Sequence, residues 1–119
     1  MIMWLQLTSD TDGGSGQVRL YAEVGPLSSH DLRHDLIEGI KSIAQEKNLK
    51  RIGFQRGASD EGKKYSKFFK KNFFPVDDVQ DHDQIANAIN KLLKSFQPEI
   101  DAVASILSNY INCSENVAQ

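Results

Sequence analysis

The residues best suited to bind a ligand are lysines and arginines interleaved with aromatic rings in the middle of the chain. Nine of the 14 basic residues lie between Lys47 and Lys71 beside two acidic ones, so this segment carries +7 while the rest of the chain carries −9. Basic side chains attract phosphates, and aromatic rings stack on unpaired bases. The pattern predicts a surface for DNA or RNA formed by Arg51, Arg56, Lys63, Lys64, Lys67, Lys70 and Lys71.

A second interpretation of this segment needs no ligand. Lysines on an edge strand keep that strand from pairing with other molecules, and the neighbouring phenylalanines would then simply fill the core. The whole chain has a net charge of −2, which is not typical of a dedicated nucleic-acid binder. Both interpretations place the lysines in solvent.

Two histidines have the spacing of metal ligands. His30 and His34 lie one helical turn apart, and His82 or Asp83 would supply a third ligand. The acid between the two histidines is Asp31, whereas zinc-peptidase helices carry a glutamate there. Solvent-facing histidines beside acids explain the pattern better, so we predict no metal site.

Other motifs of catalytic sites are present only in part. Glu61-Gly62-Lys63 has the E-x-K form of metal-dependent nucleases, but such a site also needs an acid on a neighbouring strand. Asp10 and Asp12 resemble the opening of a calcium loop. Tyr21, however, stands where the closing glutamate belongs. We therefore predict a non-catalytic protein with no cofactor.

Size and composition indicate one soluble domain. The chain has 119 residues and a mass of 13.3 kDa, too few for two self-sufficient cores. We expect the domain to span residues 1–111, with a flexible tail at 112–119. The apolar start at residues 1–7 is too short for a signal peptide or a membrane span. The single cysteine, Cys113, excludes an internal disulfide and favours a reducing cytoplasm.

An antiparallel pair of strands is predicted at the start of the chain. Residues Gln17–Gly25 alternate apolar and polar side chains at the period of two that a half-buried strand shows. Residues Ile2–Thr8 fit the partner strand, and the Asp- and Gly-rich segment between the two fits a turn. The inward side chains of the first strand would be Met3, Leu5 and Leu7.

Two helices are predicted from apolar side chains at spacings of three and four residues. The first opens with the capping pair Ser28 and Asp31 and ends near Asn48. Its apolar stripe leaves Arg33 outside and consists of Leu32, Leu36, Ile40, Ile43 and Ala44. The second runs over about 83–111, and Pro98 within it predicts a kink or two abutting helices.

The segment between these helices fits two conformations. Arg51–Arg56 and Tyr65–Phe74 are rich in aromatic residues and fit two more strands, with Gly57–Gly62 as the turn between them. The stretch Tyr65–Phe73 also fits a short basic helix. We favour the strands.

The predicted element order β-β-α-β-β-α is an α+β plan. Two helices, the last one long and kinked, would cover one face of a small antiparallel sheet. The opposite face would stay open, with Trp4, Arg19, Tyr21 and some of the lysine and phenylalanine positions on it. That distribution is more typical of a docking surface than of a ligand cavity.

Several short motifs, taken in order, resemble a known family. They are Glu23-Val24-Gly25-Pro26, the helix after it, Tyr65-Ser66-Lys67 and the terminal helix from Ile85 to Ile100. This arrangement resembles the C-terminal accessory region of some bacterial and phage proteins of the PD-(D/E)XK nuclease superfamily. Those regions combine a strand ending in a Glu-x-Gly-Pro-like turn, a Tyr-(Ser/Thr)-(Arg/Lys) strand and a last helix. The resemblance implies that the nuclease core lies upstream of this chain, so no catalytic residue is carried over.

Three functions of decreasing weight are therefore expected. The first is a non-catalytic, nucleic-acid-binding accessory module that works with a nuclease. The second is a protein-interaction or dimerisation module that uses the open sheet face or the long last helix. The third is a metal-dependent phosphodiesterase built around Glu61.

Overall fold

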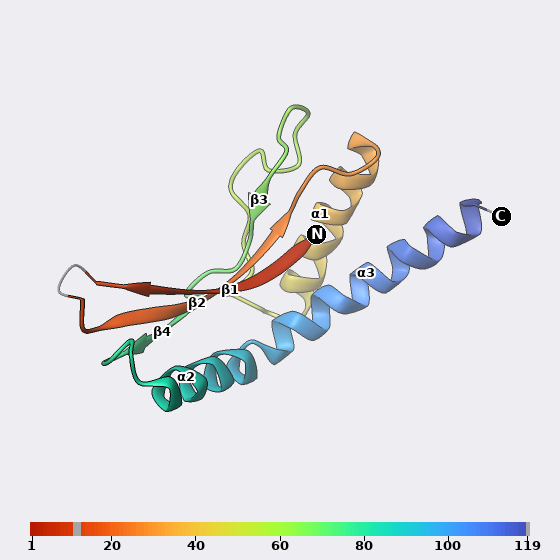
Figure 1. The fold of residues 1–119 in the computed structure, drawn as a ribbon. Helices are drawn as coiled ribbons and strands as arrows, with labels where there is room; N and C mark the ends of the chain where they lie inside the picture. Colours follow the sequence, from red (N-terminus) through yellow and green to blue (C-terminus); the bar gives the residue numbers. More distant parts are fainter. Residues whose placement is uncertain (11–12, 119) are drawn as a thin grey trace.

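In the residues that the structure describes, the protein folds as an α+β domain with a four-stranded antiparallel sheet and three helices (Figure 1). The computed structural model describes the backbone of residues 1–10 and 13–118 and the side chains up to residue 110, except 11–12. The elements are β1 (Ile2–Ser9), β2 (Gly16–Val24), α1 (His30–Glu46), β3 (Ser66–Lys67), β4 (Phe73–Val76), α2 (His82–Ser95) and α3 (Gln97–Ala118). The order is therefore β-β-α-β-β-α-α, with one helix more than predicted.

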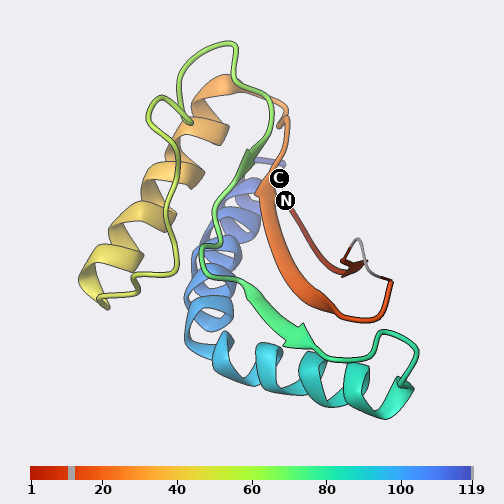
Figure 2. The same ribbon diagram turned by 90° about the vertical axis from the view of Figure 1, so that its left-hand side faces the viewer.

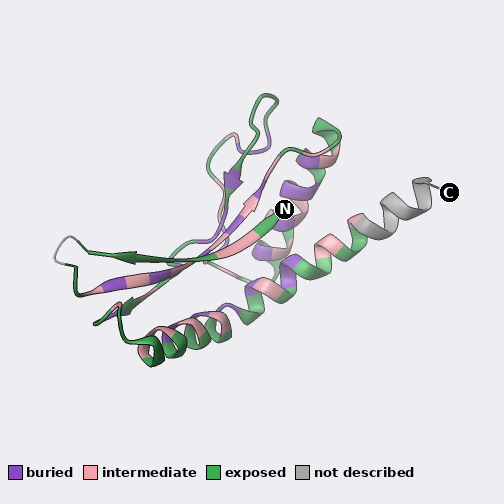
Figure 3. Ribbon diagram, in the orientation of Figure 1, coloured by how far each residue is buried: buried purple, intermediate pink, exposed green. Residues whose placement is uncertain are grey.

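The predicted N-terminal hairpin is confirmed, including its inward face. β1 and β2 pair without interruption over eight residues, with Met3, Leu5 and Leu7 opposite Ala22, Leu20 and Val18. Along β2, every second side chain is buried, which Figure 3 shows as alternating colours. Residues directly opposite in an antiparallel pair lie on the same face, so one face of the hairpin is apolar.

Helix α1 is confirmed, but two details of its prediction were wrong. The N-cap is Ser29, not Ser28, because the Ser29 hydroxyl accepts a hydrogen bond of 3.0 Å from the backbone N–H of Leu32. Arg33 lies on the buried stripe, only 3% exposed, instead of outside it. The buried residues of the helix are Arg33, Leu36, Ile37, Ile40 and Ala44.

The last helical region consists of two abutting helices, one of the two outcomes that Pro98 predicted. α2 ends at Ser95 and α3 begins at Gln97, so Pro98 occupies the first turn of α3, where its missing N–H leaves no bond unmade. Phe96 sits at the junction and is fully buried. The predicted tail, residues 112–119, lies outside the residues whose side chains are described.

The middle segment differs from the prediction. Arg51–Arg56 is not a strand: it forms one bridge, Ile52 to Phe69, and Gly53 N–H donates 2.9 Å to the carbonyl of Phe68. No helix forms over 65–73 either, and residues 56–62 make turns as expected. The pair Glu23–Lys67 and the pair Arg19–Phe73 are separated by three residues on β2, 20–22, but by five residues on the other side, 68–72. The chain between β3 and β4 therefore bulges at 68–72.

All three helices pack on the same face of the sheet, as Figure 2 shows. The apolar face of β2 shares one core with side chains of α1, α2 and α3, including Ile37, Leu92 and Phe96. α2 also packs on β4. The core thus uses one face of the sheet and leaves the other face uncovered.

Candidate nucleic-acid interface

Three of the predicted basic residues line one pocket. Its volume is about 260 Å³, and its walls come from the end of β2, the turns at 55–63 and the start of β3. We call it the basic pocket; its lining is Glu23, Gln55, Arg56, Ala58, Lys63, Tyr65, Ser66 and Lys67. Three cations and one carboxylate leave a local excess of positive charge, which favours an anionic ligand.

Backbone turns and strand pairing set the positions of these cations. Gly57 and Gly62 have positive φ values of 79° and 92° and reverse the chain between Arg56 and Lys63. β3 pairs with the end of β2, with Lys67 opposite Glu23 and Ser66 opposite Val24. Because side chains alternate along a strand, Ser66 points into the core and Lys67 points to the open face.

A buried arginine holds the walls of the basic pocket together. The guanidinium of Arg33 donates to the carbonyls of Ala58 (2.7 Å), Gly25 (3.1 Å) and Val24 (3.2 Å) and to the Ser66 hydroxyl (3.0 Å). These bonds tie the end of β2, the turn and β3 to α1. None of these partners is a carboxylate, and burial lowers the pKa of Arg33 below its usual value.

Arg33 escaped sequence analysis, although a usable signal existed. Positions 33, 36, 37, 40 and 44 follow the spacing of a buried helical stripe, and the arginine heads that stripe. Because arginine is charged, sequence patterns alone place it on the solvent-exposed side of the helix. The burial of Arg33 is favourable because the carbonyl oxygens of Val24, Gly25 and Ala58 accept its hydrogen bonds, and the last of these comes from a turn 25 residues away.

The open face of the sheet carries stacked aromatic rings. Trp4 and Tyr21 lie opposite each other on β1 and β2, with ring centroids 4.9 Å apart and an interplanar angle of 23°. The Lys67 ammonium lies 4.6 Å from the Tyr21 ring centroid and 5.7 Å from that of Trp4. Lys67 therefore joins the aromatic stack to the basic pocket, and the predicted placement of Trp4 and Tyr21 on the open face is confirmed.

The open face continues toward β4. Arg19 lies two residues before Tyr21 on β2 and pairs with Phe73 of β4, and its guanidinium carbon is 5.1 Å from the ring centroid of Phe73. Phe73 is 47% exposed, and Tyr65, at the rim of the basic pocket, is 66% exposed. Large rings at such exposure are available to contact another molecule.

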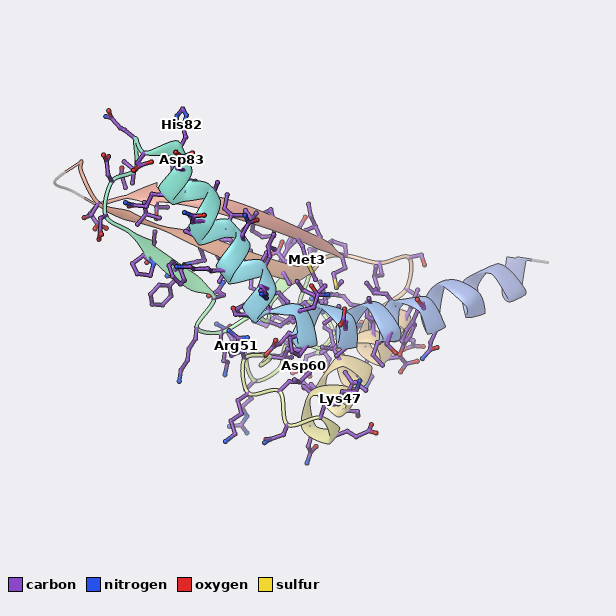
Figure 4. All side chains as sticks on the ribbon, turned by 90° about the horizontal axis from the view of Figure 1, so that it is seen from below. Met3, Lys47, Arg51, Asp60, His82 and Asp83 are labelled. Atoms are coloured by element: carbon purple, nitrogen blue, oxygen red, sulfur yellow. The ribbon has the colours of Figure 1, made fainter. Side chains whose placement is uncertain are left out.

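Arg51 lies apart from the other predicted residues. Its guanidinium pairs with the Glu99 carboxylate at 3.2 Å, donates to the Ser95 carbonyl and lies 3.9 Å from the centre of the Phe96 ring. Figure 4 shows Arg51 beside the junction of α2 and α3. The structure thus assigns Arg51 to an internal contact and does not bring it to the basic pocket.

The three remaining lysines are exposed. Lys64 directly follows Lys63, while Lys70 and Lys71 belong to the bulge at 68–72. Lys71 has a positive φ of 51°, and the Lys70 side chain lies against the backbone of Gly53. In the described part of the chain the ion pairs are Lys41–Glu38 and Arg51–Glu99, so the lysines of the pocket and the bulge remain unneutralised.

The candidate metal ligands are not brought together. The rings of His30 and His34 have centroids 6.4 Å apart, but His82 and Asp83 begin α2 at the far end of the molecule (Figure 4). Among residues 1–10 and 13–110, no three His, Cys, Asp or Glu side chains are grouped to hold an ion. Asp12 of the calcium-like pattern lies outside the described residues.

Comparison of the chain with protein-family models, with curated proteins and with solved structures finds no match. The described helices include none with the length and apolar character needed to cross a membrane.

Proposed function

We propose that this protein is a non-catalytic module that binds single-stranded nucleic acid. The basic pocket takes backbone phosphates, and the open sheet face takes bases. One observation supports this most: Lys67 lines the pocket with Arg56 and Lys63 and also lies over the Tyr21 ring. Phosphate and base sites are thus adjacent, as the covalent spacing of a nucleotide requires.

The uncovered aromatic rings favour single strands over duplexes. Bases of a single strand can stack on protein rings, and each such stack contributes about 1–3 kcal/mol with little sequence preference. The bases of a duplex are already stacked on one another. Trp4, Tyr65 and Phe73 lie on the open face or the pocket rim, where no helix of this protein competes for them.

A salt-titrated binding assay tests the proposal. The assay measures the fluorescence anisotropy of a labelled oligonucleotide of about 12 nucleotides. This length matches the stretch of single strand that comparable sheet surfaces bind. With three cations on phosphates, the logarithm of the binding constant falls with the logarithm of salt at a slope of about −2 for a single strand. A duplex of the same sequence binds more weakly.

Charge reversal at the pocket supplies the matched control. Lys63→Glu with Lys67→Glu reduces affinity by about a hundredfold or more, because two phosphate contacts become repulsive. Lys50→Glu with Lys94→Glu changes the net charge by the same amount at two exposed lysines outside the pocket and leaves binding within about twofold. Equal losses in both variants would show that only the net charge matters and would refute the proposed site.

We further propose that the module works beside a nuclease. Support comes from the resemblance of Glu23-Val24-Gly25-Pro26 and Tyr65-Ser66-Lys67 to accessory regions of that superfamily, and these two motifs lie next to each other at the β2–β3 pair. The isolated chain should bind oligonucleotides without cutting them. Cleavage by the purified chain that is lost in a Glu61→Ala variant would contradict the non-catalytic assignment.

A further inference from the structure

The two edges of the sheet are protected to very different degrees. Along the β3–β4 edge, the segment 51–53 pairs with residues 68–70, the chain bulges at 68–72, and Pro75 lies in β4. Covering segments, bulges, prolines and lysines are the devices by which proteins keep sheet edges from pairing. This edge has all four of them.

The β1 edge has none of these devices. Residues 1–9 contain no charged residue and no proline, in a chain of which 25% is charged. Its eight pairs with β2 run without a bulge. Eight residues at a rise of about 3.4 Å give an open edge of about 27 Å, with backbone groups free to form a further ladder.

The apolar face of β1 is also only partly covered. Helix α2 packs on β2 and β4, and the helices do not extend over the outer part of β1. Leu5 and Leu7 point to the core side of the sheet but remain 40% and 45% exposed. An added strand would cover these side chains as well as the open backbone edge.

We propose that β1 pairs antiparallel with β1 of a second copy of this protein and so forms a continuous eight-stranded sheet. In one register, Leu5 lies opposite the second copy's Leu5, and Met3 lies opposite the second copy's Leu7. On the other face Trp4 lies opposite the second copy's Gln6. On the core side of the sheet, apolar side chains therefore meet apolar side chains, and no charges face each other on either face.

A second copy fits this edge better than a partner of another kind. Antiparallel pairing of β1 with itself about Leu5 is two-fold symmetric, and it covers the exposed side chains of Leu5 and Leu7 with the same apolar residues of the second copy. Because β1 carries no charge, it offers no means of selecting an acidic or a basic strand. In the dimer the two open sheet faces lie side by side. The dimer does not depend on the proposed nucleic-acid binding.

Sedimentation of the full chain tests the dimer. At about 100 μM, where a micromolar dimer is fully populated, the expected mass is twice 13.3 kDa. Leu5→Lys places two ammonium groups opposite each other and raises the dissociation constant about tenfold or more. Gln6→Lys adds the same charge opposite Trp4 and leaves the constant within about threefold.

Disulfide trapping gives a second readout that does not depend on the stability of the lysine variant. In a Cys113→Ser background, Leu5→Cys should form a covalent dimer under mild oxidation, because directly opposite residues of an antiparallel pair have Cα atoms about 4.5–5.5 Å apart, within the range that a disulfide spans. Gln6→Cys should not. A monomer at all concentrations, or a dimer insensitive to Leu5→Lys and not trapped by Leu5→Cys, would overturn the proposal.

Discussion

The two faces of β2 have opposite characters within one strand. On one face, Val18, Leu20, Ala22 and Val24 are all at most 3% exposed and pack against three helices. On the other face, Arg19 and Tyr21 are half-buried and lie beside aromatic rings and Lys67. The first face determines whether the chain folds, and the second carries the proposed binding surface. Substitutions on the two faces should therefore have separable effects.

The largest expected effect lies in the core. Phe96→Ala removes a fully buried ring at the α2–α3 junction and should lower the free energy of unfolding by about 3–5 kcal/mol. Tyr65→Ala removes an equally large ring that is 66% exposed and should change stability by less than about 0.5 kcal/mol. Urea unfolding measures both. Similar losses in the two variants would contradict the separation of the faces.

Arg33 connects the two faces, so its replacement should affect both properties. Arg33→Met leaves the carbonyls of Val24 and Ala58 without their donor and should cost about 2–4 kcal/mol of stability. It should also weaken oligonucleotide binding, because the pocket walls are no longer tied to α1. Arg33→Lys keeps the charge but loses the planar guanidinium group with its several donors. This variant should recover only part of the stability and part of the affinity. Full recovery by lysine would show that charge alone matters.

Arg51 and Lys67 are both basic and only 16 positions apart, but their contacts predict different roles. Arg51→Ala breaks the partly buried pair with Glu99 and should cost about 1–3 kcal/mol of stability without lowering affinity for oligonucleotides. Lys67→Ala should leave stability within about 0.5 kcal/mol and weaken binding several-fold. Thermal unfolding and anisotropy on the same samples distinguish them. If Arg51→Ala lowered the affinity and Lys67→Ala did not, the roles assigned to these two residues would be reversed.

The smallest expected effect is the acid titration of Glu38. Hydrogen bonds from Lys41 and Ser59 hold the pKa of this carboxyl below its usual value. A carboxyl with a lowered folded-state pKa stabilises the fold above its unfolded-state pKa, and this contribution is lost as pH falls through the folded value. Glu38→Gln should therefore flatten the stability curve below about pH 4.5 by less than about 1 kcal/mol. An unchanged curve would show that these bonds contribute nothing.

The periodicity of apolar residues was sufficient to predict the elements that form the buried core between the sheet and the helices. The alternation in residues 17–24 and the spacing of apolar residues in α1 and α2 each report burial directly. The proline at 98 marked the break between the last two helices for a local steric reason. These features depend on neighbours along the chain, so sequence analysis recovers them.

The features that sequence analysis missed depend on distant partners. Phe68 and Phe69 are adjacent yet both buried, because the bulge turns the chain and Phe69 bridges to Ile52. The partner of Arg51 is Glu99, 48 residues further along, which a count of local charge does not register. Sequence therefore identified the basic segment, while the pairing of 51–53 with 68–70 decided which cations meet.

The most direct test of the two-face account is an oligonucleotide titration followed by nuclear magnetic resonance. The account predicts shifts in the Trp4 indole and in the backbone signals of Arg19, Tyr21 and Lys67, with the buried residues of α1 and α2 little changed. Shifts confined to the helices, or no shifts at concentrations that saturate a micromolar site, would contradict it.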